Sequence, residues 1–168
     1  MEIRKSTTED IKLIMAIFTT AREYMIAHGN KTQWGEGYPD EKILKTDINA
    51  GNNYVIINNG IVVGTFSFII GEEPTYQIIK NGEWTDDRLY GTIHRLASNG
   101  TIKGIARKCF EYCSEQIDYI RIDTHKDNIT MQTAIEKFGF HKCGNIYVRG
   151  GAEWIAYDYL SRNRHKLT

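Results

Sequence analysis

Apolar residues recur along this chain with helical spacing in four segments. The clearest segment runs from about residue 9 to 28, where apolar side chains lie three or four positions apart at Ile11, Ile14, Met15, Phe18, Ala21 and Met25. The same period returns over 103–116 and over 128–138, which Gly139 is expected to close. A shorter helix is predicted to begin after Asp40, its expected cap, and to end near Ala50.

Runs of β-branched and aromatic residues predict seven strands, at about 1–5, 54–59, 61–70, 88–97, 119–125, 140–149 and 153–160. Asn-Gly at 59–60 and Gly-Gly at 150–151 predict two hairpin turns, and the polar segment 71–87 predicts a loop. The unit of strand 88–97, helix 103–116 and the next strand is βαβ, so its strands should be parallel with a right-handed crossover. The order β-α-α-β-β-β-α-β-α-β-β therefore predicts an α/β (α+β) fold. Its mixed central sheet has about seven strands and is flanked by about four helices.

Length and composition bound the class of protein. The 168 residues suit one domain, expected over 1–160 and followed by a solvated tail at 161–168. The 21 basic and 21 acidic side chains balance, which argues against a nucleic-acid partner. No apolar run approaches the roughly 20 residues that span a bilayer, and the N-terminus lacks a signal-peptide pattern, so no membrane association is expected.

Cysteine usage favours a cytoplasmic protein. The chain has three cysteines, an odd number that a chain of this size does not need for disulfides. Cys109 and Cys113 are four residues apart and could share a helix face that binds a metal. They also fall in the apolar stripe of helix 103–116, which favours burial, so we predict no metal site.

One segment, LASNGTIKGIARKCF at 96–110, has the features of an anion site. A strand leads through a glycine-bearing loop into a helix, whose first backbone amides and dipole favour negative charge. Gly100 and Gly104 would let the backbone approach a phosphate closely, and Lys103 would add positive charge. The alternative is that this glycine-bearing segment is only a turn before an amphipathic helix.

The surrounding residues are similar to those of the GNAT superfamily of acyl-CoA N-acyltransferases, over nearly the whole chain. That family has Gln/Arg-x-x-Gly-x-Gly/Ala between strand and helix, and this chain has Thr-Ile-Lys-Gly-Ile-Ala at 101–106. An asparagine that opens a helix ending in Gly-Phe follows in the family; here these are Asn128 and Gly139-Phe140. The resemblance implies the GNAT fold and acetyl-CoA as cosubstrate.

By this resemblance, the coenzyme site can be assigned residue by residue. The backbone of the strand end would pair with the pantetheine arm, the amides of the loop would hold the pyrophosphate, and Asn128 would bond the pantetheine. The strand and loop residues are Leu96, Ala97, Ser98, Ile102, Lys103, Gly104, Ile105 and Ala106. Asn128 also suits a purely structural role as a helix cap.

Two positions depart from the family pattern. The first motif position is Thr101 rather than Gln or Arg, which removes one side-chain contact near the phosphates. Ile135 stands where many members have a tyrosine that is credited with protonating the departing thiolate. The acid step must therefore use another group, or be absent.

The implied reaction is direct attack of a primary amine on the thioester of acetyl-CoA. Histidine side chains titrate near neutral pH and suit proton transfer. The catalytic candidates are therefore His125, which ends strand 119–125, and His94, which lies on the strand leading into the coenzyme loop. Asp123 is a further candidate. The alternative is that these side chains only bond neighbouring backbone.

Acceptor contacts in this family come from the loop after the first helix, where Trp34 and Tyr38 are the candidates. Both could instead anchor that loop to the core. The acceptor is expected to be a small-molecule amine or a peptide amine, and the exposed C-terminal strands could pair two subunits as a homodimer. A catalytically silent acyl-CoA-binding sensor remains the alternative to an enzyme.

Overall fold

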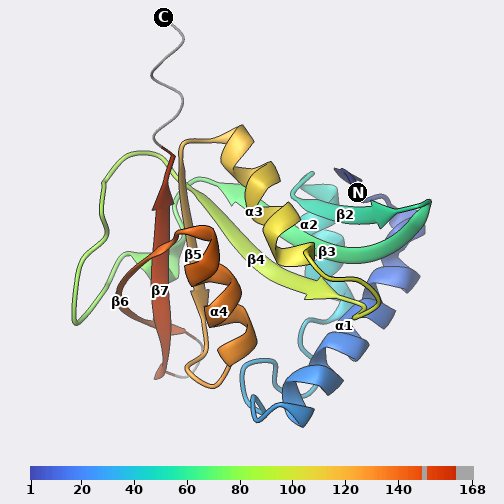
Figure 1. Cartoon of the computed structure of the whole chain (residues 1–168), viewed down its shortest axis with the longest axis horizontal. Coiled ribbons are helices and arrows are strands. Elements are labelled where there is room, and N and C mark those ends of the chain that lie inside the picture. Colours follow the sequence, from blue (N-terminus) through green and yellow to red (C-terminus); the bar gives the residue numbers. More distant parts are fainter. Residues whose placement is uncertain (149–150, 162–168) are drawn as a thin grey trace, which may run out of the picture. The chain divides into compact units, whose positions relative to one another are not determined.

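The structure is a computed structural model and describes residues 1–148 and 151–161. Its helices are α1 (Ile11–Ala27), α2 (Glu41–Asn49), α3 (Ile105–Gln116) and α4 (Ile129–Phe138) (Figure 1). Its strands are β1 (Glu2–Lys5), β2 (Asn53–Asn58), β3 (Ile61–Ile70), β4 (Gly91–Ser98), β5 (Tyr119–Thr124), β6 (His141–Val148) and β7 (Ala152–Leu160). The described part of the chain thus has the seven strands and four helices that the periodicity predicts.

The strands form one mixed sheet in the order β1-β2-β3-β4-β5-β7-β6. β4 and β5 are parallel, with Gly91 opposite Ile120 and Thr92 opposite Arg121, as the βαβ unit predicts. The pairs β1–β2, β2–β3, β5–β7 and β6–β7 are antiparallel. The mixed α/β (α+β) prediction is confirmed.

Element bounds differ from the sequence prediction most clearly at the starts of β4 and α3, each for a local reason. β4 begins at Gly91 rather than 88, and just before it the Arg88 amide donates to Asp86 Oδ1 at 2.8 Å in a turn. α3 begins at Ile105 rather than 103 because Gly104 has φ +89°, which no right-handed helix contains. Gly150 of the last predicted turn and the tail residues 162–168 lie outside the described residues.

The chain folds as two compact units. Unit 1 comprises Met1–Ile69 and Ile93–Cys109, and unit 2 comprises Ile70–Thr92 and Phe110 to the end of the described chain. The assignment of 1–160 to a single domain stays a prediction.

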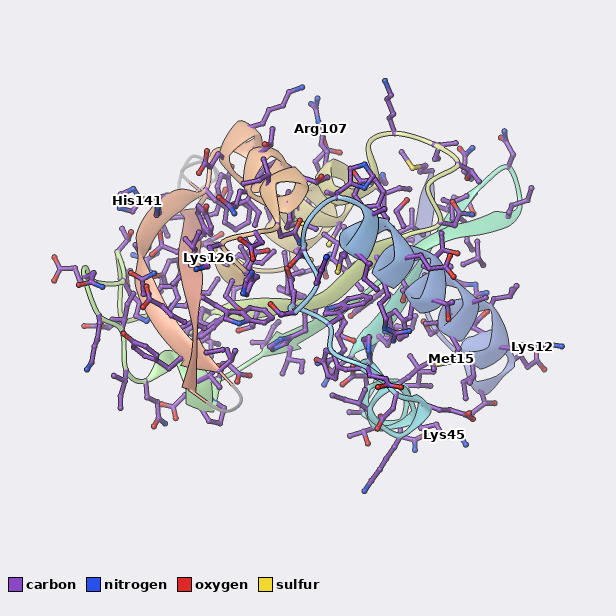
Figure 2. All side chains as sticks on the ribbon, turned by 90° about the horizontal axis from the view of Figure 1, so that it is seen from below. Lys12, Met15, Lys45, Arg107, Lys126 and His141 are labelled. Atoms are coloured by element: carbon purple, nitrogen blue, oxygen red, sulfur yellow. The ribbon has the colours of Figure 1, made fainter. Side chains whose placement is uncertain are left out.

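The core of unit 1 is built on the apolar stripe of α1. Its buried members are Ile14, Ile17, Phe18, Ala21, Met25, Trp34, Leu44, Val55 and Ala97. α1 and α2 thus pack with β2 and β4 through one cluster. Lys12 and Lys45 lie on the opposite, exposed faces of their helices and point outward (Figure 2).

The core of unit 2 is rich in aromatic residues and incorporates the polar segment 71–87. Tyr76 is 2% exposed and ends a short 3₁₀ turn (Pro74–Tyr76), and the Trp84 indole donates to its carbonyl at 3.0 Å. The Arg121 guanidinium lies 4.1 Å from the ring centre of Trp84 and 4.0 Å from that of Tyr90. The predicted loop is therefore present, and a cation–π contact holds it against β5 through Trp84.

Candidate functional site

The loop from β4 to α3 has a defined turn structure. Its Thr101 amide and hydroxyl both donate to Asn99 Oδ1, at 3.0 and 2.7 Å, and the Asn99 amide donates to the Val63 carbonyl at 2.9 Å. Gly100 and Gly104 have φ of +77° and +89°, a region that glycine enters without steric cost. The glycines that the sequence singles out are therefore required by the backbone path of the loop. Thr101 serves the turn itself.

α3 follows this loop directly (Figure 1). The Lys108 amide donates to the carbonyl of Gly104, the residue before the helix, at 3.0 Å. The first turn of an α-helix directs backbone amides outward, and the helix dipole adds positive potential at the same place. Lys103 and Arg107 are exposed and lie close by in the sequence, and the Arg107 side chain points outward (Figure 2). This arrangement can bind a phosphate group.

β4, the strand that leads into this loop, lies very close to β3 and α3. Leu96 and Ala97 are buried, with 8% and 4% of their surface exposed. A Cβ added at Gly64 of β3 would lie 2.8 Å from Ile105 Cγ2 and 3.1 Å from the Ala97 carbonyl oxygen. Gly64 therefore sets the approach of the predicted coenzyme strand and helix. Gly64 was not among the residues predicted from the sequence, although a lone glycine inside an apolar strand often marks such an approach.

The two predicted acceptor residues lie together in unit 1 with different surroundings. Trp34 is 6% exposed and packs edge-on against Phe18, with 5.6 Å between ring centres, so it anchors the loop to the core. Tyr38 is half-buried and contacts Trp34 edge-on. Its carbonyl accepts from Arg22 at 2.5 Å, and its hydroxyl accepts from Arg95 at 3.2 Å. Tyr38 is thus the one of the two with a partly exposed polar side chain.

Arg95 has an unusual backbone conformation inside β4. Its φ is +52°, in the left-handed region, which costs an L-residue other than glycine about 1–2 kcal/mol. It directly precedes Leu96, the first residue of the predicted coenzyme strand. No sequence pattern pointed to it.

Asn128 and His125 lie three residues apart in unit 2. Asn128 caps α4, with its side chain accepting from the Met131 amide at 3.0 Å, and Gly139 closes that helix with φ +115°. Both helix-end predictions are confirmed. His125 is 9% exposed, and its ring meets that of Trp154 edge-on at 6.0 Å between centres.

The contacts of His125 assign its tautomer. Nδ1 lies 3.1 Å from the backbone nitrogen of Asp127 and accepts its hydrogen. In the neutral ring the hydrogen is then on Nε2. In this form His125 can donate a hydrogen bond from Nε2. The other predicted histidine, His94, is half-buried on β4 in unit 1.

Asp123 is tied to the packed segment of unit 2. The Tyr76 hydroxyl donates to its Oδ1. Burial, and next the negative charge of Asp123, raise the pKa of Tyr76 well above its usual range, so this hydroxyl stays protonated. Asp123 therefore acts here as an acceptor that orders the 71–87 segment.

Comparison with solved structures identifies the family. The crystal structure of a GNAT-family acetyltransferase from Streptococcus agalactiae superposes on this chain with a TM-score of 0.87. The two sequences are 30% identical, and the match covers 95% of each chain. This chain belongs to the GNAT family of acetyltransferases. That membership supports acetyl transfer as its general activity.

More distant GNAT structures share the fold. An acetyltransferase of the GNAT family from Listeria monocytogenes is 15% identical with a TM-score of 0.69, covering 95% of this chain and 94% of that one. The ribosomal-protein-S18-alanine N-acetyltransferase from Escherichia coli is 14% identical with a TM-score of 0.63, covering 99% and 98%. Neither a protein-family profile nor a curated protein sequence matches the chain.

This GNAT chain has no proton donor at the position of the family tyrosine. Ile135 is 0% exposed, and as an aliphatic side chain it cannot transfer a proton. The three cysteines are free and buried, and no cluster of three metal-ligating side chains occurs in the part of the chain that the structure describes. Among the described residues, no helix is long and apolar enough to cross a membrane.

Proposed function

We propose that this GNAT chain transfers an acetyl group from acetyl-CoA to a primary amine by direct attack. The observation that carries the proposal is the loop before α3, where two left-handed glycines lead into the first turn of that helix. Such an arrangement fits a pyrophosphate. Leu96, Ala97 and Ser98 would pair with the pantetheine arm, and the amides of 102–106 would hold the phosphates. Bound acetyl-CoA supplies the activated thioester.

Proton transfer falls to the chain itself. An alkyl amine has a pKa of about 10.4 and arrives protonated, so it must lose a proton before it attacks. His94 is the candidate to accept that proton. A thiol titrates at about 8.5, so the departing thiolate needs only modest help.

His125 is the candidate to give that help. Because its Nδ1 accepts from the Asp127 amide, its neutral ring can donate only through Nε2. A hydrogen bond donated from Nε2 would stabilise the negative charge that develops on the departing sulfur or on the thioester oxygen. Asn128, three residues later, would orient the pantetheine while it caps α4.

The acceptor is proposed to be a small-molecule amine or a peptide amine that contacts Tyr38. Tyr38 fits this role better than Trp34 because its side chain is half-buried, whereas Trp34 is enclosed in the core of unit 1. A cytoplasmic location is part of the same proposal, since the three free cysteines suit a reducing compartment.

One observation favours a second candidate function. The buried Ile135 removes the usual acid, which fits a sensor that binds acyl-CoA without turning it over. Titration calorimetry with acetyl-CoA, combined with an assay for free thiol in the presence of a panel of amines, separates the two. The enzyme binds acetyl-CoA and releases thiol only when an amine is added. Binding with no amine-dependent release would assign the sensor.

A further inference from the structure

A buried ion pair in unit 1 joins two segments that the proposed function uses separately. Nε and Nη2 of Arg95 donate to Asp47 Oδ2 of α2 at 2.9 and 2.6 Å. The Arg95 and Asp47 side chains are only 9% and 7% exposed, so their charges are largely removed from water. The Ser67 hydroxyl donates to the same carboxylate oxygen at 2.6 Å, which further offsets the loss of water around that carboxylate.

The remaining nitrogen of the Arg95 guanidinium contacts the loop after α1. Nη1 of Arg95 donates to the Tyr38 hydroxyl at 3.2 Å, and the Tyr38 carbonyl is held separately by Arg22. The planar fork of arginine makes these contacts at fixed angles, which a lysine could not reproduce. One side chain therefore contacts both the loop that carries Tyr38 and the helix that carries Asp47.

The backbone of the same residue is strained. Arg95 has φ +52° within β4, a conformation that persists in a residue other than glycine only where surrounding contacts impose it. The contacts with Asp47 and Tyr38 are the ones available to impose it. Leu96, the next residue, starts the strand proposed to pair with pantetheine.

We propose that Arg95 is a positioning residue that sets the coenzyme strand and the acceptor loop together. Its ion pair with Asp47 holds the left-handed turn of β4, which aims the backbone of 96–98, and its contact with Tyr38 fixes the acceptor loop. This inference rests on the proposed function, because it assigns those two segments to acetyl-CoA and to the amine. Arg95 itself touches neither reacting group in this account.

Two substitutions separate the backbone effect from the side-chain effect. Arg95→Ala and Arg95→Gly both remove the guanidinium and both leave Asp47 unpaired, but only glycine adopts the left-handed conformation without cost. Calorimetry should find acetyl-CoA bound about tenfold more weakly by Arg95→Ala, equivalent to about 1.4 kcal/mol. Arg95→Gly should bind close to the wild-type value. If either variant does not fold, the comparison is made in an Asp47→Asn background, where loss of the guanidinium leaves no unpaired carboxylate at position 47.

Hydrogen exchange of the backbone amides of residues 29–39 reports how firmly the acceptor loop is held, and it can be measured before the acceptor is known. Exchange should rise in Arg95→Ala, Arg95→Gly and Tyr38→Phe. It should stay at the wild-type rate in Arg4→Ala, a control that removes the Arg4–Asp10 ion pair elsewhere in unit 1. A general loss of stability would raise exchange in that control as well.

The outcomes distinguish this inference from the function on which it rests. Equal acetyl-CoA affinities in Arg95→Ala and Arg95→Gly, or unchanged exchange of the loop in both, would overturn the positioning role while the wild type still binds. A wild-type chain that does not bind acetyl-CoA would overturn both the proposed function and this inference.

Discussion

Gly104 offers a sharp test of the coenzyme loop, because its role is confined to the backbone. A Cβ added there would meet only Met1 Cε, at 3.8 Å, so packing leaves room for it. The backbone conformation nevertheless disfavours any other residue, because φ at Gly104 is +89°. A non-glycine residue pays about 1–2 kcal/mol in that region, and a β-branched residue is less tolerated still. Gly104→Val should therefore fold with slightly reduced stability and a rearranged loop.

A rearranged loop should lower the affinity for acetyl-CoA much more than it lowers the free energy of unfolding. Hydrogen bonds to charged groups are worth about 1.5–3 kcal/mol each. Misdirecting two of the amides proposed to hold the pyrophosphate would then weaken acetyl-CoA binding by about 100-fold or more. Denaturant unfolding measures the stability of the variant, and titration calorimetry measures its affinity for acetyl-CoA.

Gly60 supplies a matched control. It lies in the hairpin between β2 and β3 with φ +78°, and an added Cβ there would meet no atom within 4 Å. Gly60→Val should lose about as much stability as Gly104→Val and keep its affinity for acetyl-CoA. Wild-type affinity in Gly104→Val, or an equal loss of affinity in both variants, would refute the assignment of the loop.

Three further predictions address catalysis, capping and pH. His125→Ala should lower kcat with the panel amines by about 100-fold, as loss of a hydrogen-bond donor to developing negative charge does, and change acetyl-CoA affinity much less. Asn128→Ala should cost about 1 kcal/mol of unfolding free energy as a lost helix cap and should also weaken acetyl-CoA binding. Burial, and next a neighbouring carboxylate, raise the pKa of both Cys143 and Tyr157 to about 12, so the unfolded chain gives up these protons first. The stability they contribute is complete below about pH 9 and falls as pH rises toward 12, which alkaline denaturation curves would follow.

Each of these predictions has a control or a contrary outcome. His141→Ala removes an exposed histidine and should leave kcat unchanged; wild-type kinetics in His125→Ala would remove His125 from the mechanism. Asp40→Ala removes the cap of α2, which accepts from the Ile43 amide at 2.8 Å, and should cost stability alone. If Asn128→Ala behaves in the same way, its role is only structural. A stability that is flat from pH 9 to 12 would contradict the two raised pKa values.

Local patterns account for most of what the sequence predicted correctly. The period of apolar residues on α1 reports burial directly, because every third or fourth side chain meets the same core. The Asn59-Gly60 turn has φ of +50° and +78°, the signature of the hairpin turn that this dipeptide favours. Asn128 and Gly139 were recognised as helix ends for equally local reasons.

Contacts between distant residues account for most of what it could not predict. Asp47 and Arg95 are 48 positions apart, and Tyr76 and Asp123 are 47 apart, so no spacing rule links them. The left-handed backbone conformation of Arg95 could not be predicted for a related reason, since tertiary contacts override the backbone preference of arginine.

Composition gave only part of the picture for the segment 71–87. Its many polar residues predicted a loop, which the structure shows, but they did not reveal that Tyr76 and Trp84 pack into unit 2 or that Thr85 donates to Asp158 Oδ1 at 2.8 Å. Average polarity hides a few anchoring side chains. Their partners lie on β5 and β7, which only the folded chain brings into reach.

A single-turnover assay with acetyl-CoA isotopically labelled in its acetyl group tests the central claim most directly. The chain is mixed with the labelled compound and a panel of primary amines, and mass spectrometry follows the label. Label is expected to appear on an amine nitrogen as free thiol is released in equal amount, and Gly104→Val is expected to abolish both. Label that remains on coenzyme A in every mixture, although the chain binds it, would contradict the enzyme.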